Sequence, residues 1–139
     1  MISNATANAI GSKVTPGGGR SNPELITNGD FSEGSEGWLT AADVSVKSGE
    51  VSIGPPQRPP YAAIGQNILE DRQSYDVIIN VLSVEEGVFE VLDGSNTAVA
   101  TISAAGQKSF TFTNNRGTLF SIVARSRTIL ISNVSVKKS

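Results

Sequence analysis

From Glu24 to the end of the chain, short runs rich in Val, Ile, Phe and Thr alternate with clusters of Gly, Asn, Asp and Pro. Such runs favour β-strands, because branched and aromatic side chains pack well on a pleated sheet, and the clusters between them are typical of turns. In residues 110–113 and 129–136 apolar and polar side chains alternate strictly, which predicts one buried and one wet sheet face. No helix of useful length is predicted.

The number and spacing of these runs predict an all-β domain of nine or ten strands. Residues 44–53 form a predicted hairpin in which Gly49 supplies the positive φ that its turn needs. The other predicted strands are residues 24–27, 64–69, 75–84, 88–92, 98–102, 110–113, 119–124 and 128–136. So many short antiparallel strands are accommodated most simply by two sheets packed face to face, an antiparallel β-sandwich of the jelly-roll kind.

The chain of 139 residues, enough for one domain, contains neither cysteine nor histidine. This composition excludes thiolate catalysis, cysteine or histidine metal sites and a Ser/His/Asp triad. The enzymatic alternative left is a hydrolase with two carboxylates, taken from Glu33 and Glu36 or from Glu85, Glu86, Glu90 and Asp93. Because these acids fall on predicted turns and solvated strand faces, we expect surface charges and a protein that is not an enzyme.

Charge and hydropathy argue against several classes of partner. Eleven Lys and Arg against thirteen Asp and Glu give a net charge of -2, so no broad positive field exists to attract nucleic acid. No apolar run approaches the length that crosses a bilayer, and the first ten residues lack the features of a secretion signal. We therefore expect no nucleic-acid partner, no membrane partner and no export.

Residues 1–22 differ from the rest of the chain, since they combine small polar residues with Pro16 and three consecutive glycines. Such a segment cannot build a core of its own and predicts an extended N-terminal arm before a domain of residues 23–139. Two interpretations stay open: a free tail, or an arm held by a partner or by a copy of the same chain. The arm residues predicted to contact a partner are Ile2, Ile10, Lys13, Val14, Pro16 and Arg20.

Two segments at the ends of the domain carry a family resemblance. Residues 24–38 read ELITNGDFSEGSEGW and residues 129–136 read ILISNVSV. They resemble the opening and the closing of galactose-binding-like jelly rolls, specifically carbohydrate-binding modules that begin L-I-x-N-G-D-F and end I-D-D-V-x-V. Between them, residues 62–68 and 75–77 resemble the Q-x-I and Y-x-V strands of these modules. The resemblance covers about residues 23–137 and implies the fold, which hosts many functions.

The resemblance also implies where a glycan would be recognised. Modules of this kind usually stack sugar rings on exposed aromatic side chains, whereas we expect Phe31, Trp38 and Tyr75 to be core residues. The predicted carbohydrate contacts are Arg58, Tyr61 and Gln66. An ordinary loop side chain is the alternative for Tyr61, and turn packing, rather than docking into an SH3-type groove, is expected for the PxxP run at residues 56–59.

Family members often hold a structural calcium ion between the first loop and the last strand. Here Ser32 follows Phe31, and Ser132 and Asn133 stand where the family has paired acids. Calcium prefers oxygen ligands that include carboxylates, so we predict no cofactor. Asp30 and Asn133 are the residues left to propose for such an ion.

Modules that resemble this one also occur in bacteriophage virions, as capsid decoration proteins, head fibres and tail components. Together with the arm and the lack of a catalytic constellation, this predicts a structural protein of the virion surface that is assembled in the host cytoplasm. The arm would anchor it to a larger assembly such as a capsid or tail, the sandwich would face outward, and the protein would be a homo-oligomer. The alternative is a carbohydrate-binding module that attaches to cell-surface or plant polysaccharide.

Overall fold

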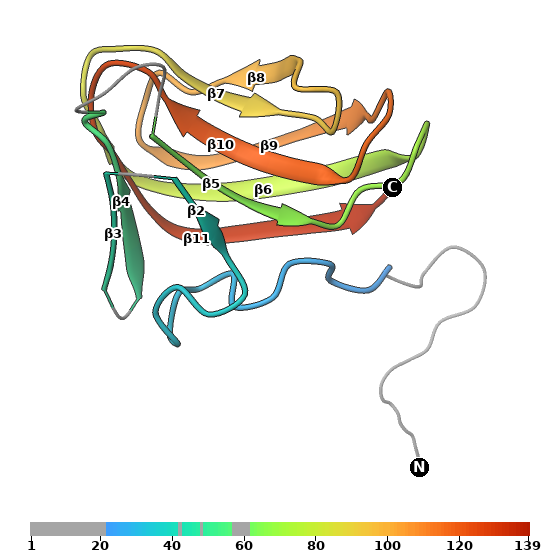
Figure 1. The fold of residues 1–139 in the computed structure, drawn as a ribbon, viewed down its shortest axis with the longest axis horizontal. Coiled ribbons are helices and arrows are strands. Elements are labelled where there is room, and N and C mark those ends of the chain that lie inside the picture. The colour runs from blue at the N-terminus through green and yellow to red at the C-terminus, as the bar shows by residue number, and fades with distance from the viewer. Residues whose placement is uncertain (1–21, 42, 48, 57–61) are drawn as a thin grey trace.

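The computed structural model describes residues 22–41, 43–47, 49–56 and 62–139. Within these ranges the chain forms ten strands and no helix, arranged as two five-stranded antiparallel sheets packed face to face (Figure 1). The predicted all-β sandwich of nine or ten strands is confirmed. None of these residues belongs to a helix that is long and apolar enough to span a membrane.

We call the two layers the first and the second sheet. The first sheet has the order β2 (Leu39–Thr40), β5 (Ala62–Asn67), β10 (Leu119–Ala124), β7 (Phe89–Leu92) and β8 (Ala98–Thr101). The second sheet has the order β3 (Val44–Lys47), β4 (Glu50–Ile53), β11 (Ile129–Lys138), β6 (Ser74–Val84) and β9 (Gly106–Thr113). In Figure 1, β5 and β10 pass in front of β6 and β9, so the outer face of the first sheet is turned toward the viewer.

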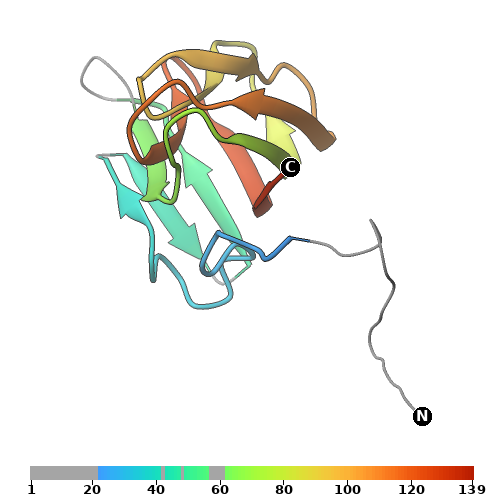
Figure 2. The same cartoon turned by 90° about the vertical axis from the view of Figure 1, so that its right-hand side faces the viewer.

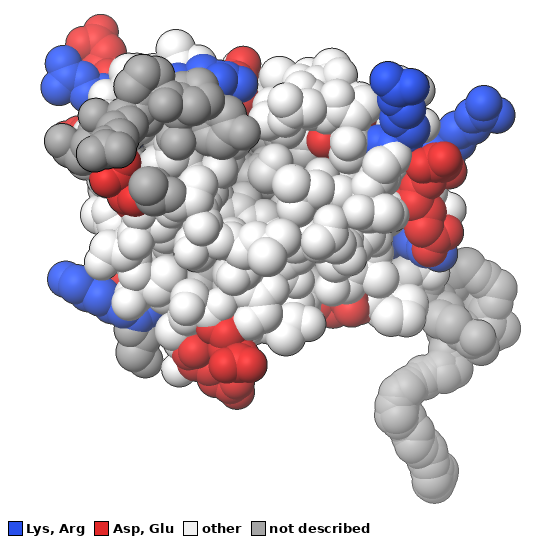
Figure 3. Space-filling view, in the orientation of Figure 1, with Lys and Arg blue, Asp and Glu red and all other residues white. Residues whose placement is uncertain are grey.

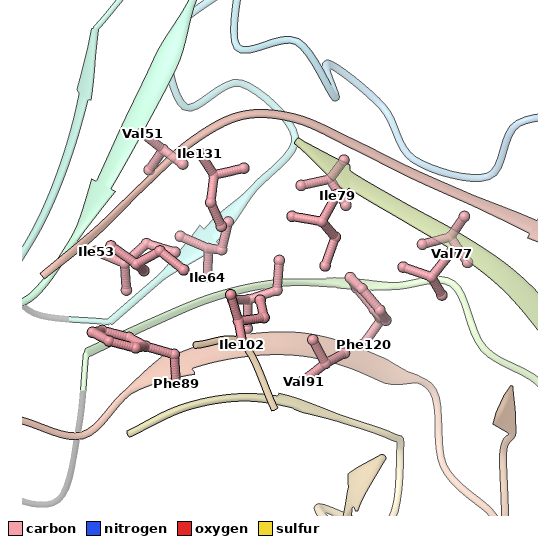
Figure 4. Close-up of a cluster of buried hydrophobic side chains, with 14 of the residues drawn as sticks. Val51, Ile53, Ile64, Val77, Ile79, Phe89, Val91, Ile102, Phe120 and Ile131 are labelled. Carbon is pink, nitrogen blue, oxygen red and sulfur yellow. The ribbon is translucent and has the colours of Figure 1, made fainter. Parts of the chain in front are cut away.

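The inward faces of both sheets supply the core, in which aliphatic side chains from β4, β6 and β11 meet those from β5, β7 and β10 (Figure 4). Phe31 and Trp38 belong to this core, and their rings stack with centroids 5.2 Å apart. Tyr75 is fully buried, and its hydroxyl accepts a hydrogen bond from the backbone N–H of Glu70 at 2.7 Å. The core positions predicted for these three aromatic residues are confirmed.

The strict alternation predicted for residues 129–136 is wrong, because two irregularities interrupt the pairing of β11 with β6. Ile131 lies opposite Val81 and Asn133 opposite Asn80, so Ser132 is an extra residue on β11. The buried positions change there from odd numbers, such as Ile131, to even numbers, such as Val134. A β-bulge shifts the side-chain phase in this way, and both halves of β11 keep their apolar side chains in the core.

Two further details differ from the expected strands. Residues 24–27 form only an isolated bridge, between Glu24 and Lys137, where a strand is predicted. The short strand β2 is not predicted by the sequence pattern, since its two residues show no period. The first described residues nonetheless lie beside the chain end in both views (Figures 1 and 2), and the Asn22 side chain donates a hydrogen bond to the Lys138 carbonyl.

Candidate functional site

A groove of about 250 Å³ lies on the outer face of the first sheet. Its floor is made by paired residues of β5 and β10, with Ala63 opposite Val123 and Gly65 opposite Ser121. Because most of these side chains are small, they leave a depression in the sheet surface between the larger side chains of Leu39 and Leu119. The lining residues are Leu39, Thr40, Ala41, Ala63, Ile64, Gly65, Asn96, Leu119, Ser121 and Val123.

The rims of the groove are aliphatic. Leu39 on β2 is 55% exposed and Leu119 on β10 is 38% exposed, so both offer apolar surface to a ligand in the groove. Gly65 lies beneath them in a crowded position, because a Cβ there would stand 2.7 Å from the Phe120 carbonyl oxygen and 3.0 Å from a Leu119 methyl carbon. A glycine at this point therefore lets β5 pass close under the Leu119 side chain.

The turn between β7 and β8 brings the side chain of Asn96 to the groove. Asp93 fixes this turn, since its Oδ1 accepts hydrogen bonds from Ser95 N at 2.9 Å, Ser95 Oγ at 2.7 Å and Thr97 N at 3.1 Å. Asn96 itself has a φ of 67°, a left-handed conformation that asparagine tolerates better than most residues. The polar wall of the groove is thus held by a buried carboxylate.

No lining residue of the groove carries a charge. Figure 3 shows the same face in space-filling form, with uncharged atoms over its middle and the Lys, Arg, Asp and Glu side chains gathered toward its margins. The groove therefore offers methyl groups together with the hydroxyl groups of Thr40 and Ser121 and the amide of Asn96. Such a surface fits a neutral ligand whose own surface is partly apolar and partly hydroxylated.

A second hollow, of about 420 Å³, lies between the first loop and the last strand and includes both Asp30 and Asn133. The Asp30 carboxylate accepts a hydrogen bond from Ser32 N at 3.0 Å, and this bond holds the pKa of Asp30 below its ordinary value. The Glu24 carboxylate accepts hydrogen bonds from the backbone N–H groups of Ile26 and Val136.

The donor set in this second hollow does not fit a structural calcium ion. The carboxylates of Glu24 and Asp30 already accept hydrogen bonds from the chain, and no group of three or more His, Cys, Asp or Glu able to hold a metal exists among the described residues. Calcium needs six to eight oxygen ligands, usually with several carboxylates. The hollow therefore brings Asp30 and Asn133 together without forming a metal centre from them.

Asn28 organises the loop that carries the N-G-D-F motif. Its side-chain Nδ2 donates to Gly34 O at 2.8 Å and to Glu36 O at 3.0 Å, and its Oδ1 accepts from Glu33 N at 3.1 Å. Its backbone carbonyl accepts a bond from Trp38 Nε1 at 2.9 Å. The motif therefore closes the loop of residues 28–38, a structural role that the sequence pattern does not indicate.

Gln66, a predicted carbohydrate contact, is 5% exposed and lies away from the groove. Its carboxamide bonds both backbone groups of Thr27, so a glycan would have to compete for its polar atoms. The other two predicted contacts, Arg58 and Tyr61, lie outside the described residues and stay predictions. The same holds for the predicted arm residues Ile2, Ile10, Lys13, Val14, Pro16 and Arg20.

Three of the acidic residues considered for a hydrolase, Glu85, Glu90 and Asp93, have separate structural partners. Glu85 accepts a bond from Thr128 N at 2.8 Å, and Glu90 forms an ion pair of 2.6 Å with Arg125 Nε. Asp93 holds the β7–β8 turn. These contacts give the carboxylates of Glu85, Glu90 and Asp93 a role in holding the fold.

No family model matches the chain, and no curated protein sequence matches it. Several solved structures are similar to this chain in fold. The second N-terminal cellulose-binding domain of β-1,4-glucanase C from Cellulomonas fimi is 19% identical with a TM-score of 0.54, over 86% of this chain and 97% of that domain. A structure of xylanase 10B from Clostridium thermocellum that contains its CBM22-1 and GH10 modules is 9% identical with a TM-score of 0.56, over 85% of this chain and 29% of that one.

The enzymatically active domain of tailspike protein 4 from bacteriophage CBA120 is 16% identical with a TM-score of 0.58, over 84% of this chain. The chain spans about a fifth of that protein's length, since the match covers 21% of it. Identities this low establish likeness of fold and nothing finer. The described sandwich therefore has the β-sandwich fold that is also found in carbohydrate-binding modules.

Proposed function

We propose that this protein is a non-enzymatic glycan-binding module that holds a neutral polysaccharide chain in the groove of the first sheet. The observation that carries the proposal is the uncharged, open groove formed by β2, β5 and β10. The shared fold with a cellulose-binding domain supports it. The motifs at residues 24–38 and 129–136 further support a galactose-binding-like jelly roll as its type.

The chemistry of the groove suits a sugar chain. A neutral glycan presents C–H groups and hydroxyl groups side by side, and the groove presents aliphatic rims beside the side chains of Thr40, Asn96 and Ser121. None of the lining residues is aromatic, so the described groove lacks a flat platform for ring stacking. We therefore expect the groove to bind a single sugar unit weakly. The stacking contact is assigned to Tyr61, the predicted aromatic contact residue.

The test is retention in native gels that contain soluble polysaccharide. The wild-type protein should be retarded by a neutral β-glucan, xylan or mannan and not by polygalacturonate. Leu119→Asp, in the groove, should reduce retention by at least about tenfold in apparent affinity. The matched control is Ile78→Asp, because Ile78 is also 38% exposed but lies on β6 of the second sheet.

Two outcomes would contradict the proposal: no retention of the wild-type protein on any glycan, or equal losses for Leu119→Asp and Ile78→Asp. Tyr61→Ala tests the predicted stacking residue separately. Retention that survives Leu119→Asp and is lost with Tyr61→Ala would move the binding site out of the groove.

A second candidate function is that of a bacteriophage virion component, displayed at the particle surface and anchored by the N-terminal arm. It is favoured by the likeness to a phage tailspike domain and by the placement of Asn22 at the surface beside Lys138. Deletion of residues 2–20 keeps Asn22 and should abolish incorporation into particles while the sandwich stays folded. Unchanged incorporation of the deletion variant would refute the anchoring role.

A further inference from the structure

The strand β9 is the longest free edge of the described sandwich. The other edge strands are short, with two residues in β2 and four each in β3 and β8. All eight residues of β9 pair with β6 on one side, and no described strand pairs with its other side. Every second residue of β9 therefore presents its N–H and C=O to solvent, a pattern that accepts another strand.

The rim beside this edge is partly apolar. Phe110 faces inward opposite Val77, yet remains only half-buried, with its ring 6.4 Å from that of Phe112. A strand added next to β9 would cover the exposed part of Phe110. Lys108 has the same inward phase and is also half-buried, so a second β9 would bring a second lysine to the same rim. Lys108 therefore disfavours a second β9 as the partner of this edge, and a segment without Lys or Arg avoids that repulsion.

The chain itself contains a segment whose sequence suits this edge. Residues 2–10 read ISNATANAI, with no charged residue, no glycine and no proline. Ala5, Ala7 and Ala9 share one phase, and the polar residues at 4, 6 and 8 share the other. Alanine and asparagine have little strand tendency of their own, so this segment needs a template to pair with.

We infer that residues 2–10 of one copy add as an antiparallel strand to the β9 edge of a neighbouring copy. In the register that fits the phases, Ala7 lies beside Phe110 and Asn8 beside Ser109. The alanines then cover the rim of the sandwich, and the polar residues face solvent. This interaction surface is independent of the glycan groove, since β9 belongs to the other sheet.

The position of Asn22 argues for a neighbouring copy as the acceptor. Asn22 is bonded to Lys138 at the end of the second sheet where β9 also ends, because Lys138 pairs with Tyr75 and Ser74 with Thr113. If residues 2–10 paired antiparallel with β9 of their own chain, residue 10 would lie at the far end of β9 from Asn22. Residues 11–21 would then have to span roughly 30 Å, because they would run the length of eight strand residues and cross three strand spacings. The fully extended reach of these eleven residues is about 36 Å, so such a strand would hold a linker with three consecutive glycines close to full extension, at a cost in conformational entropy.

The described strand pairs are all antiparallel, and a strand donated to a neighbouring copy keeps that sense without its linker having to cross the donor's own sheet. Each copy then donates one strand and accepts one. Such a head-to-tail contact closes into a ring or continues as a chain of copies.

The experiment measures the mass of the full chain by light scattering over a range of concentrations. We expect oligomers that dissociate on dilution, and we expect Ala7→Pro to give monomers at every concentration, because proline removes a backbone donor from the added strand. The matched control is Ser12→Pro, which lies in the linker and should leave the oligomer intact. Both variants should keep the wild-type circular dichroism spectrum.

Cross-linking identifies the acceptor, because the native chain contains no cysteine. Asn8→Cys and Ser109→Cys, made in separate chains and mixed, should give a disulfide between the two chains on mild oxidation. Two results would overturn the inference: a wild-type chain that is monomeric at all concentrations, or a doubly substituted chain that forms the disulfide within one monomer. Loss of glycan retention would affect neither readout, so the two proposals fail separately.

Discussion

Gln66 bonds both backbone groups of Thr27: its Oε1 accepts from Thr27 N at 3.1 Å and its Nε2 donates to Thr27 O at 2.7 Å. The pair connects β5 of the first sheet to the segment that runs alongside β11 of the second sheet. The glutamine carboxamide thus forms with Thr27 the pair of hydrogen bonds that a residue of a neighbouring β-strand would form. It satisfies two polar groups at the open side of the sandwich.

Removing this pair should destabilise the fold. Gln66→Ala leaves two backbone groups of Thr27 without partners, and we expect a loss of about 1–3 kcal/mol in the free energy of unfolding. Urea titration followed by circular dichroism measures it. Gln107→Ala, on the exposed face of β9, is the control and should change stability by less than about 0.5 kcal/mol. Equal changes for both variants would refute the role of the pair.

Asn28→Asp tests the loop that carries the N-G-D-F motif. Aspartate has the same shape and tolerates the φ of 55°, but its carboxylate would face the carbonyl oxygens of Gly34 and Glu36 without a proton to donate. We expect a loss of about 1–3 kcal/mol in stability. The single tryptophan, Trp38, reports on the same loop through its bond to Asn28 O, so its fluorescence should shift to longer wavelength.

The control for this variant is Gln107→Glu, because Gln107 is exposed on β9 and the substitution makes the same change of charge far from the loop. An unchanged fluorescence maximum in Asn28→Asp, with wild-type stability, would show that the loop does not depend on the Asn28 amide.

Asp93 should contribute a pH-dependent part of the stability. Burial raises the pKa of its carboxyl group, but hydrogen bonds from Ser95, Asn115 and Thr97 outweigh burial and hold the pKa below the ordinary value of 3.8. The folded state therefore binds this proton less readily than the unfolded state. The stabilisation is present above that ordinary value and is lost as the pH falls through the lowered pKa.

Asp93→Asn should accordingly be less stable than the wild type at neutral pH, and the difference should shrink in acid. Thermal unfolding between neutral pH and pH ~2 measures both chains. Glu86→Gln, at an exposed position, is the control and should follow the wild-type profile. A constant difference between Asp93→Asn and the wild type at all pH values would contradict the assignment.

Gly94 tests how closely the loops at one end of the sandwich approach each other. A Cβ at Gly94 would lie 2.4 Å from the Gly117 carbonyl carbon and 2.5 Å from the Arg116 carbonyl oxygen. Because both atoms belong to the backbone, we expect Gly94→Ala to cost about 3 kcal/mol. Gly34→Ala is the control: a Cβ there would meet nothing within 4 Å, and only its φ of 66° costs about 1 kcal/mol.

Urea unfolding ranks the two variants directly. If Gly34→Ala proved as destabilising as Gly94→Ala, the close approach of the two loops would not be a determinant of stability.

The strands were the part of the structure most open to prediction from sequence, because side-chain alternation reflects burial directly. Phe112 and Ile129 lie in the core as their pattern indicates. The predicted strict alternation failed at Ser132, where an extra residue shifts the buried phase from Ile131 to Val134, a shift that the two consecutive polar residues Ser132 and Asn133 accommodate. It also missed β2, whose two residues are held by their register with β5 rather than by propensity.

The candidate site was less predictable than the fold. The groove is formed by small side chains, such as Ala63 and Ser121, which have no chemical signature in a sequence. Only the strand order, which brings β5 beside β10, gives them a common surface. The conspicuous residues behaved differently: Asn28, Trp38 and Gln66 are used to close and hold the sandwich.

The bond between Asn22 and Lys138 has a consequence for protein engineering. The chain enters the sandwich at Asn22 and leaves it at Lys138, and these two residues are in contact. The whole domain can therefore be inserted into a surface loop of a host protein with little strain. The same closeness allows Asn22 and Lys138 to be joined by a short linker once residues 1–21 are removed, and new ends to be opened in a distant turn, which gives a circular permutant. The domain is therefore suited to display from a single attachment point on a larger particle.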